Sequence, residues 1–222
     1  RRGGEWLHLV RAGFAHDGAG LAVGLRGGDA VELPPFRGFL AEHLVHAQHD
    51  MTLHREVEEG ELLISGKVVS VAQRRPGTFV VLRMEARGEA GEGVSTTDYG
   101  MLYRGVALEG GDRALERVED PPSHGQELKK IGEVGIAATA AHVYTECARI
   151  WNPIHTDPEY AREAGLPGII LHGTATLAFS VSAVLGKFSF HNPGRVRCRF
   201  TGMVLMPGAL RVHASRQGDA IA

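Results

Sequence analysis

Three segments in the first half of the chain, residues 62–73, 78–85 and 94–103, are rich in Val, Ile and Thr and are separated by polar, Gly-containing turns. This pattern predicts long strands. Because the connections between them are short, we expect the three strands to form an antiparallel meander. Residues 1–50 show no sustained period, and we expect short strands and loops there.

The second half of the chain has a helical pattern first and a strand pattern afterwards. Residues 137–151 are Ala-rich and lack Gly and Pro, which predicts a helix that ends before the Asn152-Pro153 pair. Asp157 and Pro158 have the form of an N-cap and a first-turn proline, so a short helix is expected over 157–165. Residues 174–185 are apolar nearly all round, which indicates a buried helix.

Two strands are expected after this helix. Residues 195–200 alternate Arg with apolar side chains, which predicts a strand with Arg195, Arg197 and Arg199 on a solvated face. The stretch TGMVLMPGALRVHA, with a turn at Pro207-Gly208, faintly repeats LHREVEEGELLISG of the first half. The repetition indicates two copies of one α+β unit, in which a sheet wraps a helix. We therefore divide the chain into an N-terminal half (1–109), a linker (110–126) and a C-terminal half (127–222).

Composition excludes several classes of function. The formal net charge is only -2 and no Lys/Arg run is present, which argues against nucleic-acid binding. No apolar run approaches a membrane span of about 20 residues. Two cysteines, Cys147 and Cys198, are interpreted as small core side chains in a reducing, cytoplasmic compartment. The first residue is not Met, so the chain is expected to be a piece of a longer one.

A cluster of histidines raises the question of a metal site. The stretch HLVHAQHDMTLH lacks the pair of histidines at i and i+4 with an acid that a zinc-binding helix carries. Exposed or sheet-border histidines are the better interpretation, and neither a metal nor another cofactor is predicted. The residues concerned are His43, His46, His49 and His54.

Three short motifs in the second half resemble those of the MaoC-like enoyl-thioester hydratase/dehydratase family: Tyr144, Asn152-Pro153-Ile154-His155 and His172-Gly173. The resemblance implies an α+β double hotdog fold, in which an antiparallel sheet wraps a buried central helix in each of two repeats. It also implies hydration of trans-2-enoyl thioesters or dehydration of (R)-3-hydroxyacyl thioesters carried on coenzyme A or a carrier protein. The implied assembly is a double-hotdog monomer or a homodimer, with the site in the C-terminal half.

The chemistry explains several of these residue types. Addition of water to the β carbon needs a base, and His155 can offer a ring nitrogen near neutral pH. The negative charge that builds on the thioester oxygen can be held by main-chain N–H groups at a helix start, where Gly173 allows close approach. Thr176 adds a hydroxyl to the first turn of that helix. His172 is assigned to substrate binding, although a buried structural histidine is the commoner case.

The chain departs from the family pattern at two positions. The acid expected two residues before Asn152 is Ile150, and the glycine before it is Arg149. Glu146 lies one helical turn before Ile150 and is a candidate replacement. Alternatively His155 acts without an acid, or the protein only binds acyl thioesters, with Arg149 pairing a substrate carboxylate. A thioesterase with Glu146 as base is a further alternative. Asp157 is not favoured as the partner of His155, because its carboxylate is expected to cap a helix.

Overall fold

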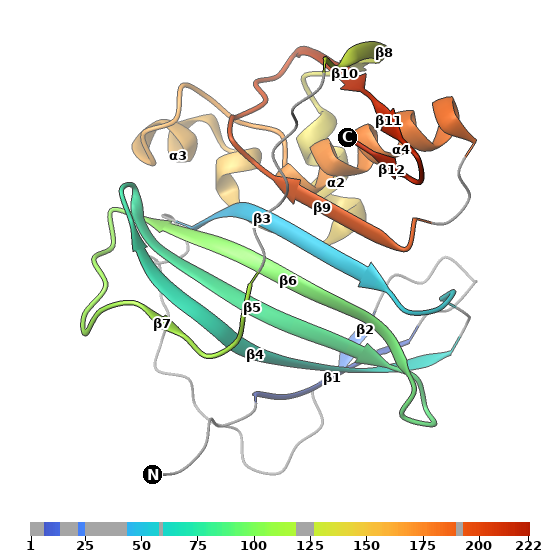
Figure 1. The fold of residues 1–222 in the computed structure, drawn as a ribbon. Helices are drawn as coiled ribbons and strands as arrows, with labels where there is room; N and C mark the ends of the chain where they lie inside the picture. Colours follow the sequence, from blue (N-terminus) through green and yellow to red (C-terminus); the bar gives the residue numbers. More distant parts are fainter. Residues whose placement is uncertain (1–6, 14–21, 25–43, 58–59, 119–126, 190–192) are drawn as a thin grey trace. The chain divides into compact units, whose positions relative to one another are not determined.

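The computed structural model describes residues 7–13, 22–24, 44–57, 60–118, 127–189 and 193–222 (Figure 1). The chain divides into two compact units. The first unit contains Arg1–Pro121 and Pro193–Arg199, and the second contains Pro122–Asn192 and Phe200–Ala222. Among the described residues, all helices belong to the second unit.

The first unit is an antiparallel sheet whose strands follow the order β2-β1-β4-β5-β6-β3-β9, with β7 paired to β4. Figure 1 shows the long central strands side by side. The bounds are β1 Leu7–Gly13, β2 Ala22–Gly24, β3 Leu44–Leu53, β4 Glu61–Arg74, β5 Gly77–Arg87, β6 Gly93–Arg104, β7 Arg113–Ala114 and β9 Arg195–Arg199.

The predicted meander is confirmed in β4, β5 and β6, which pair in antiparallel register along nearly their whole length. The tight turn before β5 requires Gly77, because a Cβ there would lie 2.0 Å from the carbonyl oxygen of Tyr103. Val69 and Val81, on β4 and β5, are among the buried core residues of this unit. Part of the segment expected to be a linker is attached to the sheet, since β7 pairs with β4 at Ser70 and Val71.

Strand β3 carries buried polar groups that the sequence pattern did not identify. Asp50 is only 7% exposed, and its carboxylate accepts hydrogen bonds from Arg195 and Arg197 on the neighbouring β9. A buried carboxylate is tolerated only when it is paired in this way. The prediction that these arginines form a solvated face is therefore wrong for Arg197, whose side chain is 20% exposed.

The histidines of β3 differ from their predicted exposure. His46 and His49 are half-buried, and the His46 ring stacks on Tyr99 with centroids 3.9 Å apart. Burial, reinforced by the nearby His49, lowers the pKa of His46 to about 4 against the opposing bond to the Gln48 main chain. His54 is exposed as expected, and His43 lies outside the described residues.

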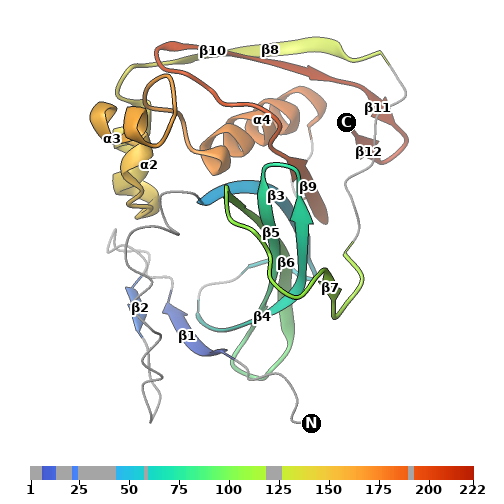
Figure 2. The ribbon, with the colours of Figure 1, turned by 90° about the vertical axis from the view of Figure 1, so that its left-hand side faces the viewer.

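The second unit contains the helices and two small antiparallel sheets, β8 with β10 and β11 with β12. Figure 2 shows β8 and β10 side by side, with α4 alongside them. The bounds are β8 Lys129–Ile136, α2 Ala140–Ala148, the 3-10 helix η1 Pro153–His155, α3 Pro158–Glu163, α4 Gly173–Phe188, β10 Gly208–Ala214, β11 Arg216–Gln217 and β12 Ala220–Ile221.

Pairing of β8 with β10 repeats the pairing of β1 with β4. Leu62 and Leu210, which the sequence repeat aligns, stand near the start of β4 and β10 and face Ala12 and Val134 across the two strand pairs. This register supports the predicted repeat. Strand β8 itself was not predicted.

One core cluster of the second unit joins β8, α2 and α4. It contains the buried residues Ile136, Ala141, Leu171 and Ala175, with Tyr144, Val204 and Leu210 packed against them. Burial of Ile136 and Leu171 contributes roughly 1.5–3 kcal/mol each. Cys147, predicted to be a core side chain, is exposed, and Cys198 is partly buried. No helix in the described residues is both long and apolar enough to cross a membrane.

Candidate functional site

The candidate site begins where helix α2 ends. Arg149 caps the helix in the left-handed region, with φ 54°, and its main-chain N–H donates to the carbonyl oxygen of Thr145. Asn152 then precedes Pro153, and its Oδ1 accepts a hydrogen bond of 3.3 Å from the N–H of Ile154. The asparagine of the motif therefore holds the turn that carries His155.

A second cap follows directly. Oδ1 of Asp157 accepts from the N–H groups of Glu159 at 2.8 Å and Tyr160 at 3.1 Å, so the predicted N-cap of α3 is confirmed. Ile154 is buried with Ala161 and Ile170 in a second core cluster. This cluster anchors the short 3-10 helix.

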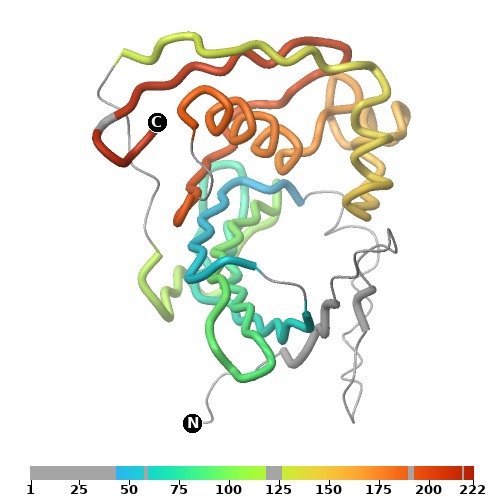
Figure 3. Tube along the Cα trace, turned by 90° about the vertical axis from the view of Figure 1, so that its right-hand side faces the viewer, coloured from blue at the N-terminus to red at the C-terminus, as the bar shows by residue number. Residues whose placement is uncertain are grey.

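In Figure 3 the Cα trace passes from α2 through α3 to the start of α4 at one end of this unit.

His155 is buried and its ring orientation is set by the main chain. Its Nδ1 lies 2.8 Å from the carbonyl oxygen of Ile170. A carbonyl oxygen only accepts, so Nδ1 carries the hydrogen and Nε2 keeps its lone pair in the neutral ring. Burial lowers the pKa of His155, and the bond to Ile170 opposes that shift. At neutral pH His155 is accordingly an unprotonated base with a defined tautomer.

His172 packs directly against His155. The two rings are stacked with centroids 3.6 Å apart and an interplanar angle of 24°. His172 is 2% exposed, and its Nε2 lies 3.2 Å from Oγ1 of Thr145 on α2. Burial and the charge of His155 lower the pKa of His172 to about 4, although the main chain of Ile150 raises it. Both rings are neutral near pH 7.

Helix α4 begins at Gly173, directly after His172. Its first main-chain bond runs from the N–H of Thr176 to the carbonyl oxygen of His172, at 3.0 Å. The N–H groups of the first turn before Thr176 have no partner within the helix, which is the arrangement that holds a developing oxyanion. A Cβ at Gly173 would lie 3.4 Å from the ring of Phe200. The Thr176 hydroxyl donates to the carbonyl oxygen of His172 at 3.2 Å.

The structure brings together some of the predicted residues and not others. The His155 and His172 rings are stacked, Gly173 directly follows His172, and Asn152 caps the 3-10 helix that contains His155. Ile150 is 37% exposed and meets His172 through its main chain. Glu146 and Arg149 are exposed, and within the described residues no hydrogen bond or ion pair joins the Glu146 side chain to His155.

Thr145 was missed by sequence reasoning. It is 5% exposed and supplies the partner of His172. The signal was present in the sequence, because Ala141 and Thr145 are four residues apart and hence on one face of the helix. The carbonyl oxygen of Ile170 has no such signal, since any residue type supplies it.

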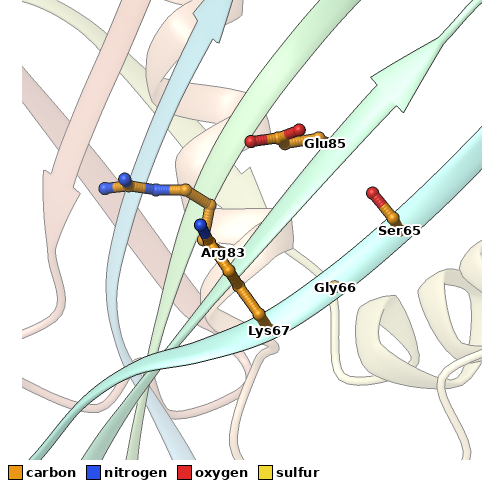
Figure 4. A pocket seen from close by; sticks show the side chains of 5 residues that line it. All are labelled: Ser65, Gly66, Lys67, Arg83 and Glu85. Carbon is orange, nitrogen blue, oxygen red and sulfur yellow. The ribbon is translucent and has the colours of Figure 1, made fainter. Parts of the chain in front are cut away.

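A surface hollow in the first unit is not the candidate site. It is an open depression of about 140 Å³, solvent included, between β4 and β5, where Figure 4 shows Ser65 and Lys67 projecting from β4 and Arg83 and Glu85 from β5. Ligand pockets are concave spaces that typically measure about 300–1,000 Å³, whereas this depression has almost no enclosed volume. Lys67 and Arg83 already pair with Glu116, and Arg83 also pairs with Asp98. Among the described residues, no group of three or more side chains is suited to a metal ion.

Known proteins are similar to this chain in sequence. The sequence profile of the MaoC like domain matches residues 120–222. Residues 120–222 belong to the MaoC-like domain family. A Drosophila melanogaster peroxisomal multifunctional enzyme type 2 is 33% identical over 167 residues, which are 73% of this chain and 28% of that protein. A probable enoyl-CoA hydratase 2 of Dictyostelium discoideum is 24% identical over 78% of this chain and 58% of its own length.

Solved structures confirm the predicted fold of this chain. A MaoC-like dehydratase from Phytophthora capsici has a TM-score of 0.70 at 19% identity, covering 80% of this chain and 63% of that one. A Mycobacterium tuberculosis protein described as a double hotdog has a TM-score of 0.54 at 13% identity, over 81% of this chain and 67% of its own. The predicted α+β double hotdog is therefore correct. The chain spans less than two thirds of the length of the Drosophila melanogaster and Dictyostelium discoideum relatives.

Proposed function

We propose that this MaoC-like protein hydrates trans-2-enoyl thioesters, or in reverse dehydrates (R)-3-hydroxyacyl thioesters, with His155 as the base. The observation that carries the proposal is the bond from Nδ1 of His155 to the carbonyl oxygen of Ile170. This bond leaves the lone pair of Nε2 available, in a ring that stacks on His172, the residue directly before α4. All candidate residues belong to the second unit. We propose a catalytic half over 127–222, a linker over 110–126 and a non-catalytic half over 1–109, in which β7 of the linker and β9 of the catalytic half join the sheet of the first unit.

The proposed mechanism uses one base for both proton transfers. Nε2 of His155 removes a proton from water while the water oxygen bonds to the β carbon. The π electrons of the alkene shift toward the thioester carbonyl, whose oxygen becomes negative and is held by the first N–H groups of α4. The His155 imidazolium then delivers the proton to the α carbon as the carbonyl reforms. This route needs no acid at position 150, where the chain has Ile150.

The rate of this mechanism depends on pH through His155. Only the neutral ring can remove the proton, and the pKa of His155 is lowered from 6.5 by burial. We therefore expect kcat/KM to rise with pH on an acid limb with its midpoint below 6.5, and then to level off. The measurement is kcat/KM for an enoyl thioester between about pH 4 and pH 8. A rate that falls as pH rises through this window would count against His155 as the base.

Arg149 is proposed to bind an anionic group of the substrate. It is exposed and holds a left-handed conformation, φ 54°, that glycine adopts more easily. Arg149→Gly is expected to stabilise the protein by about 1 kcal/mol in thermal unfolding, because the backbone strain disappears. The same variant is expected to raise KM for an enoyl-coenzyme A by roughly tenfold, the loss of about one charge-assisted hydrogen bond.

Ser189→Gly is the matched control for Arg149→Gly. Ser189 also ends a helix in the left-handed region, with φ 52°, and its substitution should stabilise the protein without changing KM. Equal KM values in the wild type and Arg149→Gly would remove Arg149 from the binding site. Repeating the measurement with an enoyl thioester of N-acetylcysteamine, which lacks phosphates, distinguishes a coenzyme A phosphate from a carboxylate on the acyl group.

The carrier, compartment and assembly belong to the same proposal. Coenzyme A is the proposed carrier, in keeping with the relatives named enoyl-CoA hydratase 2, and an acyl-carrier protein is the alternative. A cytoplasmic location agrees with two free cysteines, whereas some relatives are named peroxisomal. Because both repeats lie on one chain, we propose a double-hotdog monomer in preference to a homodimer. Light scattering on the purified protein measures its mass and distinguishes the two assemblies.

One assay tests the proposed activity against its alternatives. The protein is incubated with short and medium trans-2-enoyl-coenzyme A thioesters, and loss of the conjugated double bond is followed together with release of free thiol. Loss of the double bond without thiol is the expected result. Thiol release would instead identify a thioesterase, and tight binding with neither change would identify a non-catalytic acyl-thioester-binding protein.

A further inference from the structure

His172 has a set of contacts that a purely packing side chain does not need. It is 2% exposed, so it cannot touch a substrate from solvent, yet it is a polar ring in the core. Its Nε2 is 3.2 Å from the hydroxyl of Thr145, and Nδ1 is buried without a hydrogen bond of good geometry. Burying a polar group without a partner destabilises the folded protein. An apolar side chain of similar shape would avoid this cost.

The contacts of His172 connect three segments of the candidate site. Thr145 lies on α2, His172 precedes α4, and the His155 ring stacks on His172 at 3.6 Å. The His172 ring also interacts with the main chain of Ile150, the position at which the family pattern has its acid. His172 therefore links helix α2 and the start of α4 to the ring of the base.

The stack restricts the orientation of the His155 ring. The other restraint on this ring is the bond from Nδ1 to the carbonyl oxygen of Ile170. A flat surface 3.6 Å away prevents the ring from tilting out of the plane that this bond requires. At that separation two positively charged rings would repel each other strongly, because the site is largely shielded from water. His172 consequently remains neutral when His155 becomes the imidazolium during hydration.

We propose that His172, anchored by Thr145, is a positioning residue that holds the His155 ring with Nε2 toward the substrate, a task for which this chain has no acid at position 150. This inference rests on the proposed function, because it concerns the same base. It assigns to Thr145 and His172 a joint effect on kcat with little effect on KM. Neither side chain contacts the substrate in this scheme.

Variants of Thr145 and His172 test the positioning role. Thr145→Val removes the hydroxyl at nearly constant volume, and His172→Phe keeps a flat ring while removing both nitrogens. We expect each to lower kcat by roughly ten- to a hundredfold, with KM within about twofold of the wild type, because the base is misplaced while binding is intact. The double variant should lose no more than the worse single variant, since both act through one contact. If the fold-loss of kcat in the double variant equals the product of the two single losses, Thr145 and His172 do not act through one contact.

Thr139→Val is the matched control. Thr139 is an exposed threonine at the N-cap of the same helix, and its side chain makes no cap hydrogen bond. This variant should retain wild-type kcat and KM. If Thr145→Val behaves like Thr139→Val in kcat, His172 is only a packing residue and the proposal is wrong.

A measurement without substrate separates this proposal from the proposed function. Nitrogen-15 NMR of the His155 ring in the full chain at neutral pH reports which nitrogen carries the hydrogen. The wild type should show the Nδ1–H tautomer alone, and Thr145→Val should show a mixture of both tautomers. A change of this kind supports the positioning role even if the wild type hydrates no enoyl thioester. An unchanged tautomer in both Thr145→Val and His172→Phe overturns it, whatever the activity.

Discussion

Replacing His155 with alanine is expected to lower kcat/KM for hydration by about 10²–10⁴-fold, the usual contribution of a general acid–base group. The loss follows from removal of the single lone pair that can accept the proton from water. The measurement is the initial rate at which the conjugated enoyl thioester disappears. Because alanine also leaves the carbonyl oxygen of Ile170 without its donor, His155→Gln is a second variant that retains an N–H donor but no imidazole base.

Glu146→Gln is the control for His155→Ala. The Glu146 side chain is exposed on α2, so its neutralisation should leave kcat/KM within about twofold of the wild type. Both variants must have a thermal unfolding midpoint close to that of the wild type, so that a loss of activity does not reflect unfolding. If Glu146→Gln loses as much activity as His155→Ala, Glu146 is the missing acid and the one-base mechanism is incorrect. A fully active His155→Ala would remove His155 from the mechanism altogether.

Introducing an acid at position 150 is expected to accelerate hydration. Ile150→Asp places a carboxyl group where the family pattern has one, next to the segment that carries His155. A second proton-transfer group typically contributes at least about 10²-fold, so kcat should rise by roughly that factor. The cost in stability should be small, because Ile150 is 37% exposed and need not bury a charge. Steady-state kinetics at neutral pH measure the change.

Ile150→Asn is the matched control for this gain. Asparagine has the shape of aspartate but neither accepts nor releases a proton at neutral pH. The gain should therefore be confined to the aspartate variant. Equal rates in Ile150→Asn and Ile150→Asp would attribute any change to shape, and no gain in either would mean that His155 already performs both transfers without limiting the rate.

Local patterns predicted the elements whose stability is encoded by neighbouring residues. The cap at Asp157 and the proline after it define α3 directly, and the runs of β-branched residues define β4 to β6. Only short strands were predicted before residue 50, and the ten-residue strand β3 was not, because its buried positions include Gln48 and Asp50, which appear polar in the sequence. Asp50 is compatible with a strand only because Arg195 and Arg197, far along the chain, neutralise it. No local pattern contains that information.

Local sequence also predicted part of the candidate site, namely the residues that belong to short motifs. The Asn-Pro turn and the His-Gly helix start identify His155, His172 and Gly173 from local sequence. The partner of each ring comes from elsewhere in the chain, a main-chain carbonyl at Ile170 for His155 and the hydroxyl of Thr145 for His172. Sequence reasoning therefore looked for an acidic partner of His155, and the contact that fixes its tautomer is a backbone group.

The most direct test of the account is the identity of the product that this protein forms from a trans-2-enoyl-coenzyme A. Mass spectrometry and chiral analysis of the product are made for the wild type and His155→Ala. The account predicts that the wild type forms the (R)-3-hydroxyacyl thioester, with the gain of one water and the thioester intact, and that His155→Ala forms it far more slowly. A product consisting of free acid and thiol, or an unchanged substrate after prolonged incubation with the wild type, would contradict it.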